Sequence, residues 1–370
     1  MGLSVIFGDE TMDKFYAVIM AGGRGERFWP LSTSSRPKQM ISMFGGKSLM
    51  AMAVERLEGL IPIENIFVVT SDTLVAATRE AAPGLKPENV IGEPMGRDTA
   101  AAVALGSALV ASRDPNAAFC VVTADHIIGD LDIFRATLRD SLTLALEDDL
   151  LFTIGITPTF PSTGFGYIDA GDAFEYEGST EILKARRFVE KPDESTAREY
   201  VDAGHYYWNA GMFVWSVSSI RRALASFTPA LHAMALEIEP CIGTPQFETR
   251  LREVYEPLER ISIDYAVMEK SDNILMARGK FAWGDVGTWT AIENHFEADA
   301  AGNTIVGRAE TVDSGNNIVV SEGRVTALLG VDDLVVVHAE HATLICTRDR
   351  AEDIKQLVAQ LKDAGHEDVL

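Results

Sequence analysis

The segment from Tyr16 to Met40 limits most strongly what this chain can fold into. An apolar, β-prone run over Tyr16–Met20 ends at three closely spaced glycines, Gly22, Gly23 and Gly25. This pattern predicts a buried strand that opens into a loop with unusual backbone freedom. Because glycines let backbone N–H groups approach an anion closely, we expect the loop to wrap phosphate groups.

Basic residues accompany this loop although the chain is strongly acidic. Arg24, Arg27, Arg36 and Lys38 supply positive charge suited to phosphate oxygens, whereas the formal net charge of the whole chain is -23. Such an acidic balance argues against general binding to nucleic acid or to an anionic membrane surface. We therefore expect small phosphorylated substrates, drawn in by the local positive charge.

Two familiar phosphate-binding patterns do not fit the segment. A dinucleotide-binding fingerprint requires a third glycine at the position that Phe28 occupies, and a P-loop ending at residues 46–48 requires a glycine where Ile41 stands. A surface turn rich in Gly and Arg is the alternative to a phosphate loop.

Length and hydropathy indicate a globular protein with room for two domains. The chain has 370 residues, 47% of them hydrophobic, and contains no apolar run of about twenty residues. The first residues lack the pattern of a signal peptide, so we expect a cytoplasmic location without a membrane partner. Residues 1–12 are expected to be an N-terminal extension, since the strand-forming pattern begins just after Asp13. The three distant cysteines fit reduced core residues.

Apolar strands alternate with amphipathic helices between Tyr16 and about Arg113. With helices expected over residues 48–60 and 72–82 and a strand over residues 66–70, this rhythm predicts a parallel sheet covered on both faces. An alanine-rich helix should follow GEPMGRDTA, with Asp98 or Thr99 as its N-cap.

A carboxylate stands just beyond another apolar strand, expected over residues 118–123. Because open α/β sheets bind ligands at the carboxyl ends of their strands, Asp125 is a candidate ligand for Mg²⁺, with capping of the next turn as the alternative. Asp285 stands in a comparable context, between a glycine and a bulky residue just before an expected helix. His126 is interpreted as a hydrogen-bonded structural residue.

The middle of the chain alternates strand-like motifs with helices. Strand-like segments are GFGYID (164–169), KARRFVEKP (184–192) and WNAGMFVW (208–215), and helices are expected over residues 193–203, 217–226 and 246–254. In ISIDYAVMEK we interpret Asp264 as a helix N-cap and Glu269 as a solvated residue. Beyond Ala300, short β-prone segments separated by Gly, Asn and Asp predict a small β domain, followed by a helix over residues 349–364.

Nine motifs, taken in order along the chain, resemble those of sugar-nucleotide pyrophosphorylases, in their mannose-1-phosphate guanylyltransferase branch. They are GGRGERFWP, RPKQ, GEPMGRDTA, TADH, GFGYI, FVEKP, WNAGMF, SIDYAVME and WGDVGTW. The resemblance runs from Asp13 to about Lys362. It implies an α/β fold, with a Rossmann-like, GT-A-like nucleotidyltransferase domain over residues 13–298. A small left-handed β-helix-like domain with a terminal helix would follow over residues 299–370.

The same resemblance implies transfer of GMP from GTP to α-D-mannose 1-phosphate, giving GDP-mannose and pyrophosphate by Mg²⁺-dependent in-line attack on the α-phosphorus. Arg27 and the glycine loop would hold the triphosphate, Lys38 would neutralise the α-phosphate, and Asp125 and Asp285 would ligate Mg²⁺. The implied nucleotide-facing residues are Glu93, Pro94, Arg97, Asp98 and Thr99. The implied sugar-phosphate residues are Gly166, Glu190, Lys191 and Asn209.

Two other functions share parts of this pattern. A uridylyl- or thymidylyltransferase acting on glucose 1-phosphate would keep the glycine loop and both aspartates, but the FWP, RPKQ and WNAGMF variants disfavour it. A non-enzymatic sugar-nucleotide sensor is disfavoured by Arg27, Lys38, Asp125 and Asp285. Some members of the branch carry a phosphomannose isomerase domain after the transferase; since the sequence ends at Leu370, we expect one activity. The β-rich region and terminal helix are compatible with a homodimer.

Overall fold

The computed structural model describes residues 9–23 and 25–370, so Arg24 and the first eight residues of the expected N-terminal extension lie outside the described chain. Packing divides the chain into two compact units that interleave along the sequence. Of the described residues, unit 1 comprises 9–22, 54–123 and 128–282, and unit 2 comprises 23, 25–53, 124–127 and 283–370. The domain boundaries expected after residues 12 and 298 remain predictions.

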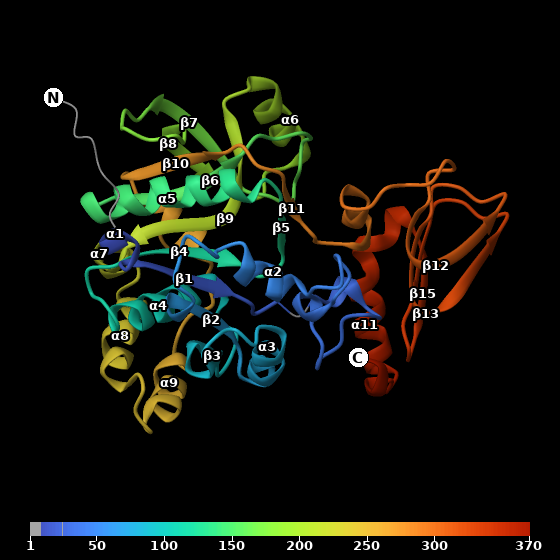
Figure 1. Cartoon of the computed structure of the whole chain (residues 1–370), viewed down its shortest axis with the longest axis horizontal. Helices are drawn as coiled ribbons and strands as arrows, with labels where there is room; N and C mark the ends of the chain where they lie inside the picture. The colour runs from blue at the N-terminus through green and yellow to red at the C-terminus, as the bar shows by residue number, and fades with distance from the viewer. Residues whose placement is uncertain (1–8, 24) are drawn as a thin grey trace. The chain divides into compact units, whose positions relative to one another are not determined.

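Unit 1 is built on a nine-stranded mixed sheet (Figure 1). Its strands in spatial order are β3 (Val90–Glu93), β2 (Ile66–Ser71), β1 (Phe15–Met20), β4 (Ala118–Thr123), β9 (Tyr206–Ser216), β6 (Leu151–Ile156), β10 (Ile274–Gly279), β8 (Ile182–Val189) and β7 (Tyr167–Ala173). The first four are mutually parallel, which confirms the parallel sheet predicted for this part of the chain. β9 runs antiparallel to both β4 and β6.

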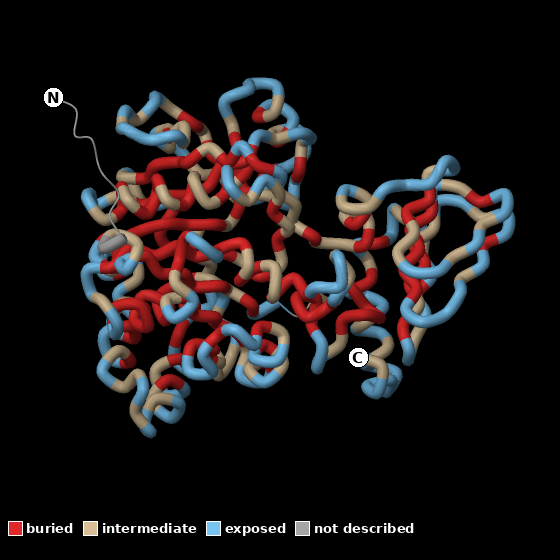
Figure 2. Tube along the Cα trace, in the orientation of Figure 1, coloured by how far each residue is buried: buried red, intermediate tan, exposed pale blue. Residues whose placement is uncertain are grey.

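Helices cover this sheet on both faces. Alternate strand residues such as Val18, Phe67 and Val121 share a core with α4 (Asp98–Ala111), where Gly106 permits the helix to approach Val18 closely. The intervening residues Ile19 and Val122 are also fully buried, and α5 (Leu131–Glu147) packs against β4, β6, β9 and β10 outside that core. Figure 2 shows that buried residues follow one another along these strands. The remaining helices of unit 1 are α1 (Asp9–Met12), α3 (Val75–Ala81), α6 (Glu194–Ala203), α7 (Val217–Phe227), α8 (Pro229–Ile238), α9 (Phe247–Tyr255) and α10 (Ile263–Ala266).

Several helical expectations need correction. The helix expected over residues 48–60 is the shorter α2 (Leu49–Glu55), and α8 was not predicted. The N-cap position of α4 is held by Arg97 without a side-chain capping bond, and Asp98, at φ 66°, accepts a hydrogen bond from the adjacent Thr99 amide instead of capping the helix. Asp264 is not an N-cap either, because Ser262 fills that position of α10.

Unit 2 joins the glycine-rich segment to the end of the chain through an aromatic core. Trp289 Nε1 donates to the carbonyl of Trp29 at 3.1 Å, and Trp29 Nε1 donates to the carbonyl of Val369 at 2.8 Å. Phe28 packs on Trp289 with ring centroids 4.8 Å apart. Large buried rings therefore fix the backbone on which the loop stands.

The C-terminal part of unit 2 is a four-stranded sheet and a helix. Its strands are β12 (Thr304–Val312), β13 (Ile318–Leu329), β14 (Leu334–His338) and β15 (Thr343–Thr347), and the helix is α11 (Ile354–Asp363). β12, β13 and β14 are parallel, and β15 is antiparallel to β14. The small β region and terminal helix predicted from sequence are thus present. Among the described residues, no helix combines the length and the apolar character needed to span a bilayer.

Candidate active site

Three charged residues predicted to act in catalysis meet within unit 2. Lys38 Nζ lies 3.1 Å from Asp125 Oδ2 and 3.8 Å from Asp285 Oδ1. The Lys38 side chain is only 7% exposed, whereas both carboxylates remain partly open to solvent. A buried cation therefore stands against two accessible carboxylates.

Local structure explains why these groups meet. Lys38 begins a short 3-10 turn after Pro37, and its Nζ lies 5.4 Å from the centre of the Phe28 ring. Asp125 falls between β4 and β5 (His126–Ile128), and Asp285 is the last residue of β11 (Trp283–Asp285). β5 and β11 pair in a two-stranded sheet, so Asp285, at the end of β11, is brought near Asp125, which directly precedes β5.

The charge balance keeps Asp125 ionised. Burial opposes its ionisation, but the Lys38 ammonium outweighs burial and lowers the pKa of Asp125 to about 2. His126 itself accepts a hydrogen bond from Trp283 Nε1 at 3.2 Å, in keeping with a structural role.

The pair of carboxylates fits a metal ion that shares its ligands with a substrate. Within residues 9–23 and 25–370, no group of three or more His, Cys, Asp or Glu side chains could hold a metal by itself. Mg²⁺ is commonly bound by one or two carboxylates together with phosphate oxygens, and it keeps several waters. Asp125 and Asp285 are the candidates for the protein part of such a set.

The glycine-rich loop approaches Lys38 directly. Gly25 has φ 64°, and a Cβ on it would collide with the Cβ of Lys38 and lie 3.0 Å from the Lys38 amide nitrogen. Ser32 Oγ donates to the Gly25 carbonyl at 2.6 Å, which holds this backbone in place. Gly23 faces open space. Of these three glycines, Gly25 is the one at which the surrounding packing leaves no room for a side chain.

Arg27 lies in the short 3-10 helix Glu26–Phe28. Its Nε is buried and has no hydrogen-bond partner in the part of the chain that the structure describes. A buried donor without a partner is costly, so this atom is a candidate for contact with a ligand.

A second group of predicted residues gathers in unit 1, where β3 ends at Glu93. Tyr255 donates its hydroxyl hydrogen to Glu93 Oε1 at 3.0 Å, and a Cβ on Gly22 would lie 3.7 Å from Oε2. Burial, with Asp72 and Asp98 nearby, raises the pKa of Glu93 to about 7 despite the Tyr255 hydrogen bond. Glu93 can therefore change its hydrogen-bonding character near neutral pH.

The turn after Glu93 uses its side chains in packing. Arg97 donates from Nε to the Tyr255 carbonyl at 3.2 Å and from Nη2 to the Glu256 carbonyl. The Thr99 hydroxyl accepts from the Ile263 amide at 2.8 Å. Arg97 and Thr99 thus hold the turn to α9 and α10.

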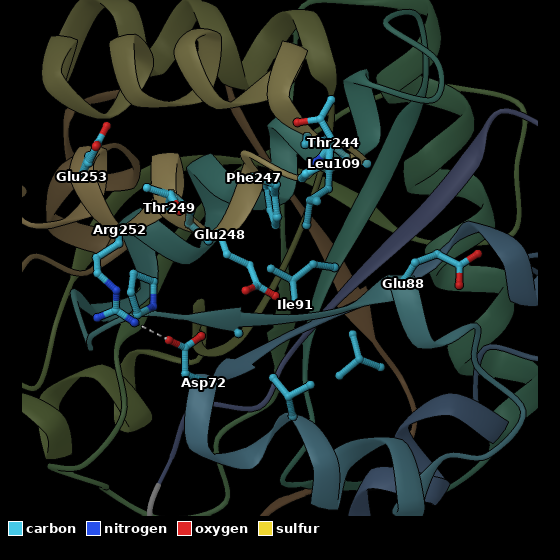
Figure 3. A pocket seen from close by; sticks show the side chains of 18 of the residues that line it. Asp72, Glu88, Ile91, Leu109, Thr244, Phe247, Glu248, Thr249, Arg252 and Glu253 are labelled. Carbon is cyan, nitrogen blue, oxygen red and sulfur yellow. Dashed lines mark hydrogen bonds and ion pairs between the residues drawn. The ribbon is translucent and has the colours of Figure 1, made fainter.

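A pocket with a volume of about 980 Å³ lies beside this turn, at the β3 edge of the sheet (Figure 3). Asp72 and Arg252 face each other there and form a 3.0 Å ion pair, and the apolar residues Ile91, Leu109 and Phe247 also line the pocket. Of the predicted site residues only Pro94 lines this pocket, so it does not bring the other predicted residues together.

The four predicted sugar-phosphate residues form a third group, also in unit 1. Asn209 N donates to the Gly166 carbonyl at 2.8 Å, and a Cβ on Gly166 would collide with Glu190 Oε2. Lys191 Nζ lies 2.9 Å from Glu190 Oε1, and this hydrogen bond raises the pKa of Lys191. The structure therefore brings Gly166, Glu190, Lys191 and Asn209 together.

Two neighbours of these groups were not predicted as site residues. Asp264 accepts a hydrogen bond from Asn209 Nδ2 at 2.7 Å, and Tyr255 contacts Glu93 as described. Asp264 stands in the SIDYAVME motif, which was a usable signal, but its position suggested a helix cap. Nothing in the sequence around Tyr255 marks it out.

Comparisons with known proteins establish the family. The Nucleotidyl transferase family profile matches residues 16–302, and the MannoseP isomerase/GMP-like beta-helix domain profile matches residues 307–361. A mannose-1-phosphate guanylyltransferase of Escherichia coli (strain K12) is 34% identical over 96% of this chain and 76% of its own length. One of Klebsiella pneumoniae is 35% identical over 93% of this chain and 73% of its own.

A solved structure agrees over nearly the whole chain. The crystal structure of a protein described as mannose-1-phosphate geranyltransferase from Thermus thermophilus has a TM-score of 0.85 at 36% identity, covering 94% of this chain and 99% of that one. These matches confirm the predicted nucleotidyltransferase fold and its β-helix-like C-terminal region. The chain therefore belongs to the nucleotidyl transferase family, among the mannose-1-phosphate guanylyltransferases.

Proposed function

We propose that this protein transfers GMP from GTP to α-D-mannose 1-phosphate and releases GDP-mannose and pyrophosphate, with Mg²⁺ as its metal. The observation that carries this proposal is the position of Lys38 Nζ against Asp125 and Asp285. Two carboxylates beside a buried ammonium suit a reaction in which phosphate anions and a divalent cation must be held together.

The reaction requires little acid–base chemistry from the protein. The phosphate of mannose 1-phosphate already carries an anionic oxygen, which forms a bond to the α-phosphorus of GTP while the bond from that phosphorus to the pyrophosphate oxygen breaks. The main obstacle is the approach of two anions. Bound Mg²⁺, held by Asp125 and Asp285, would neutralise phosphate charge and stabilise the leaving pyrophosphate.

The chain's own cations would act on the same charges. Lys38 would neutralise the α-phosphate, and Arg27 Nε, which is buried without a hydrogen-bond partner among the described residues, would donate to the triphosphate. The Gly22, Gly23 and Gly25 backbone would surround the phosphates, with Gly25 allowing the close approach to Lys38.

The unit 1 groups would recognise the two substrates. Glu93 offers a carboxylate to the N–H groups of guanine, in a turn completed by Pro94, Arg97, Asp98 and Thr99. Gly166, Glu190 and Asn209 would contact mannose hydroxyls, and Lys191 would contact the phosphate of mannose 1-phosphate. These roles rest on the family membership together with the contacts within each group.

The test is pyrophosphate release by the purified protein with Mg²⁺, using GTP, ATP, UTP and dTTP, each with mannose 1-phosphate and glucose 1-phosphate. Release confined largely to GTP with mannose 1-phosphate is the expected result. Preference for another pair would overturn the proposed specificity and leave the chemistry intact. Nucleotide binding without release for any pair would contradict the proposed reaction.

The metal requirement needs its own control. Chelation of divalent ions should abolish release with GTP and mannose 1-phosphate, and added Mg²⁺ should restore it. Full activity after chelation would refute the proposed metal.

A further inference from the structure

The side chain of Asn209 is held in one orientation by three neighbours. Its Oδ1 accepts from the Thr153 hydroxyl at 3.0 Å and from the Gly211 amide at 3.2 Å, and its Nδ2 donates to Asp264 Oδ1 at 2.7 Å. Two donors on one side and a carboxylate on the other leave no ambiguity about which end of the amide is which. Both acceptor positions on Oδ1 are therefore occupied by the protein.

One hydrogen of this amide is left over. Among residues 9–23 and 25–370, the second Nδ2 hydrogen meets no acceptor, although Nδ2 can donate two hydrogen bonds. Asn209 can therefore offer a ligand a donor and has no acceptor to offer.

An irregularity in the sheet produces this arrangement. The register of β9 against β6 shifts between Thr153 and Gly155, and Gly211 adopts φ 63°. Bulges of this kind re-aim a side chain and are common next to functional sites. Here the Gly211 amide turns back onto Asn209 Oδ1.

Asp264 lies among the charged groups of the same cluster. Burial, followed by the Glu190 carboxylate, raises the pKa of Asp264 to about 6, while the Asn209 hydrogen bond and Lys191 act in the opposite direction. Burial, followed by the same Glu190 carboxylate, also raises the pKa of Glu269. A half-buried carboxylate beside a second carboxylate is unfavourable for folding, which makes Asp264 a candidate for a functional role.

We propose that Asp264 is a positioning residue of the sugar-phosphate subsite, which fixes the Asn209 carboxamide so that its remaining Nδ2 hydrogen donates to a sugar hydroxyl. This inference rests on the proposed function for the identity of the sugar phosphate. It assigns Asp264 no contact with the reacting atoms.

Loss of the Asp264 carboxylate should change KM for mannose 1-phosphate more than it changes kcat. Asp264→Ala should raise KM for mannose 1-phosphate about tenfold, the effect of losing one well-oriented hydrogen bond, and should change KM for GTP less than about twofold. Asp264→Asn keeps an oxygen that can accept from Asn209, so it should recover most of the affinity.

A double-mutant cycle tests whether Asp264 acts through Asn209. If it does, the Asp264→Ala/Asn209→Ala variant should have a KM for mannose 1-phosphate no higher than that of Asn209→Ala alone. Additive effects, or an equal rise in KM for GTP, would overturn the proposal.

Asp140→Asn is the matched control. Asp140 is a buried carboxylate in the same unit that accepts hydrogen bonds from Tyr176, Ser179 and Thr180. The Asp140→Asn variant should have lower thermal stability and an unchanged KM for mannose 1-phosphate. A rise in this KM equal to that of Asp264→Ala would show that the effect of Asp264→Ala is merely structural.

The wild type separates this proposal from the proposed function. If the wild type prefers another nucleotide and sugar phosphate, the proposed function fails and the cycle is run with that pair. If no pair reacts, calorimetric titration with mannose 1-phosphate replaces KM, and binding that is unchanged in Asp264→Ala, or undetectable in the wild type, overturns the inference.

Discussion

Lys38 Nζ lies 3.1 Å from Asp125 Oδ2, so a buried ammonium already neutralises a carboxylate that we propose as a metal ligand. Lys38→Met should therefore strengthen binding of a divalent ion in the absence of nucleotide, because the ion no longer competes with a fixed positive charge. Titration with Mn²⁺, followed by its magnetic resonance signal, should show several-fold tighter binding in the variant. Turnover should nevertheless fall sharply. Unchanged or weaker Mn²⁺ binding would show that Lys38 does not compete with the metal.

Asp125→Ala should damage catalysis far more than folding. Loss of a metal ligand and charge-stabilising group typically costs about a hundredfold or more in kcat. Asp125 itself is partly exposed, and the buried Lys38 ammonium would still lie 3.8 Å from Asp285, so the substitution should cost only about 1 kcal/mol of folding stability. Steady-state kinetics and a thermal melt on the same preparation compare the two effects. Near-normal turnover in this variant would refute the metal assignment.

Gly25→Ala should displace Lys38. The added methyl group would collide with Lys38 Cβ, and the φ of 64° is itself unfavourable for alanine by about 1–2 kcal/mol. Gly45→Ala is the matched control, since Gly45 has φ 62° but nothing within 4 Å of the added Cβ. Both variants should lose similar stability from the backbone, whereas only Gly25→Ala should lose most of its kcat. Equal kcat values would mean that the contact with Lys38 does not matter for turnover.

Glu93→Gln should alter the pH dependence of stability. The folded protein keeps the Glu93 proton up to about pH 7, whereas the unfolded chain releases it near the ordinary pKa of 4.5. The folding stability from this group is therefore fully present below about pH 4.5 and is lost as pH rises to about 7. Urea unfolding of both proteins from about pH 5 to about pH 8 should show the wild type losing stability relative to the variant over that interval. A constant difference would refute the raised pKa.

The sequence predicted elements well where burial alone determines them. The strand expected over residues 118–123 coincides with β4, because a continuous apolar run in a buried parallel sheet leaves little alternative. Helices with weaker patterns were harder to predict. α8 was missed although Thr228 and Pro229 are suitable residues for the start of a helix.

Long-range contacts explain what could not be predicted at the site. Asp264 suits a helix cap by its local sequence, but its partner Asn209 is 55 residues away and Ser262 takes the cap. Likewise, Lys38 and Asp125 are 87 residues apart in the sequence, and only the family resemblance predicted that both act at one site. Local patterns report neighbours along the chain, whereas side-chain roles depend on neighbours in space.

The hydrogen bond from Trp29 to the Val369 carbonyl, together with that from Ser34 to the Leu370 carbonyl, has a consequence for synthesis of the protein. During translation, Trp29 and Ser34 emerge from the ribosome long before the residues they bind are made. Unit 2 can therefore complete its packing only after Val369 and Leu370 have left the ribosome. A nascent chain stalled before Val369 would leave the Trp29 indole N–H without this acceptor.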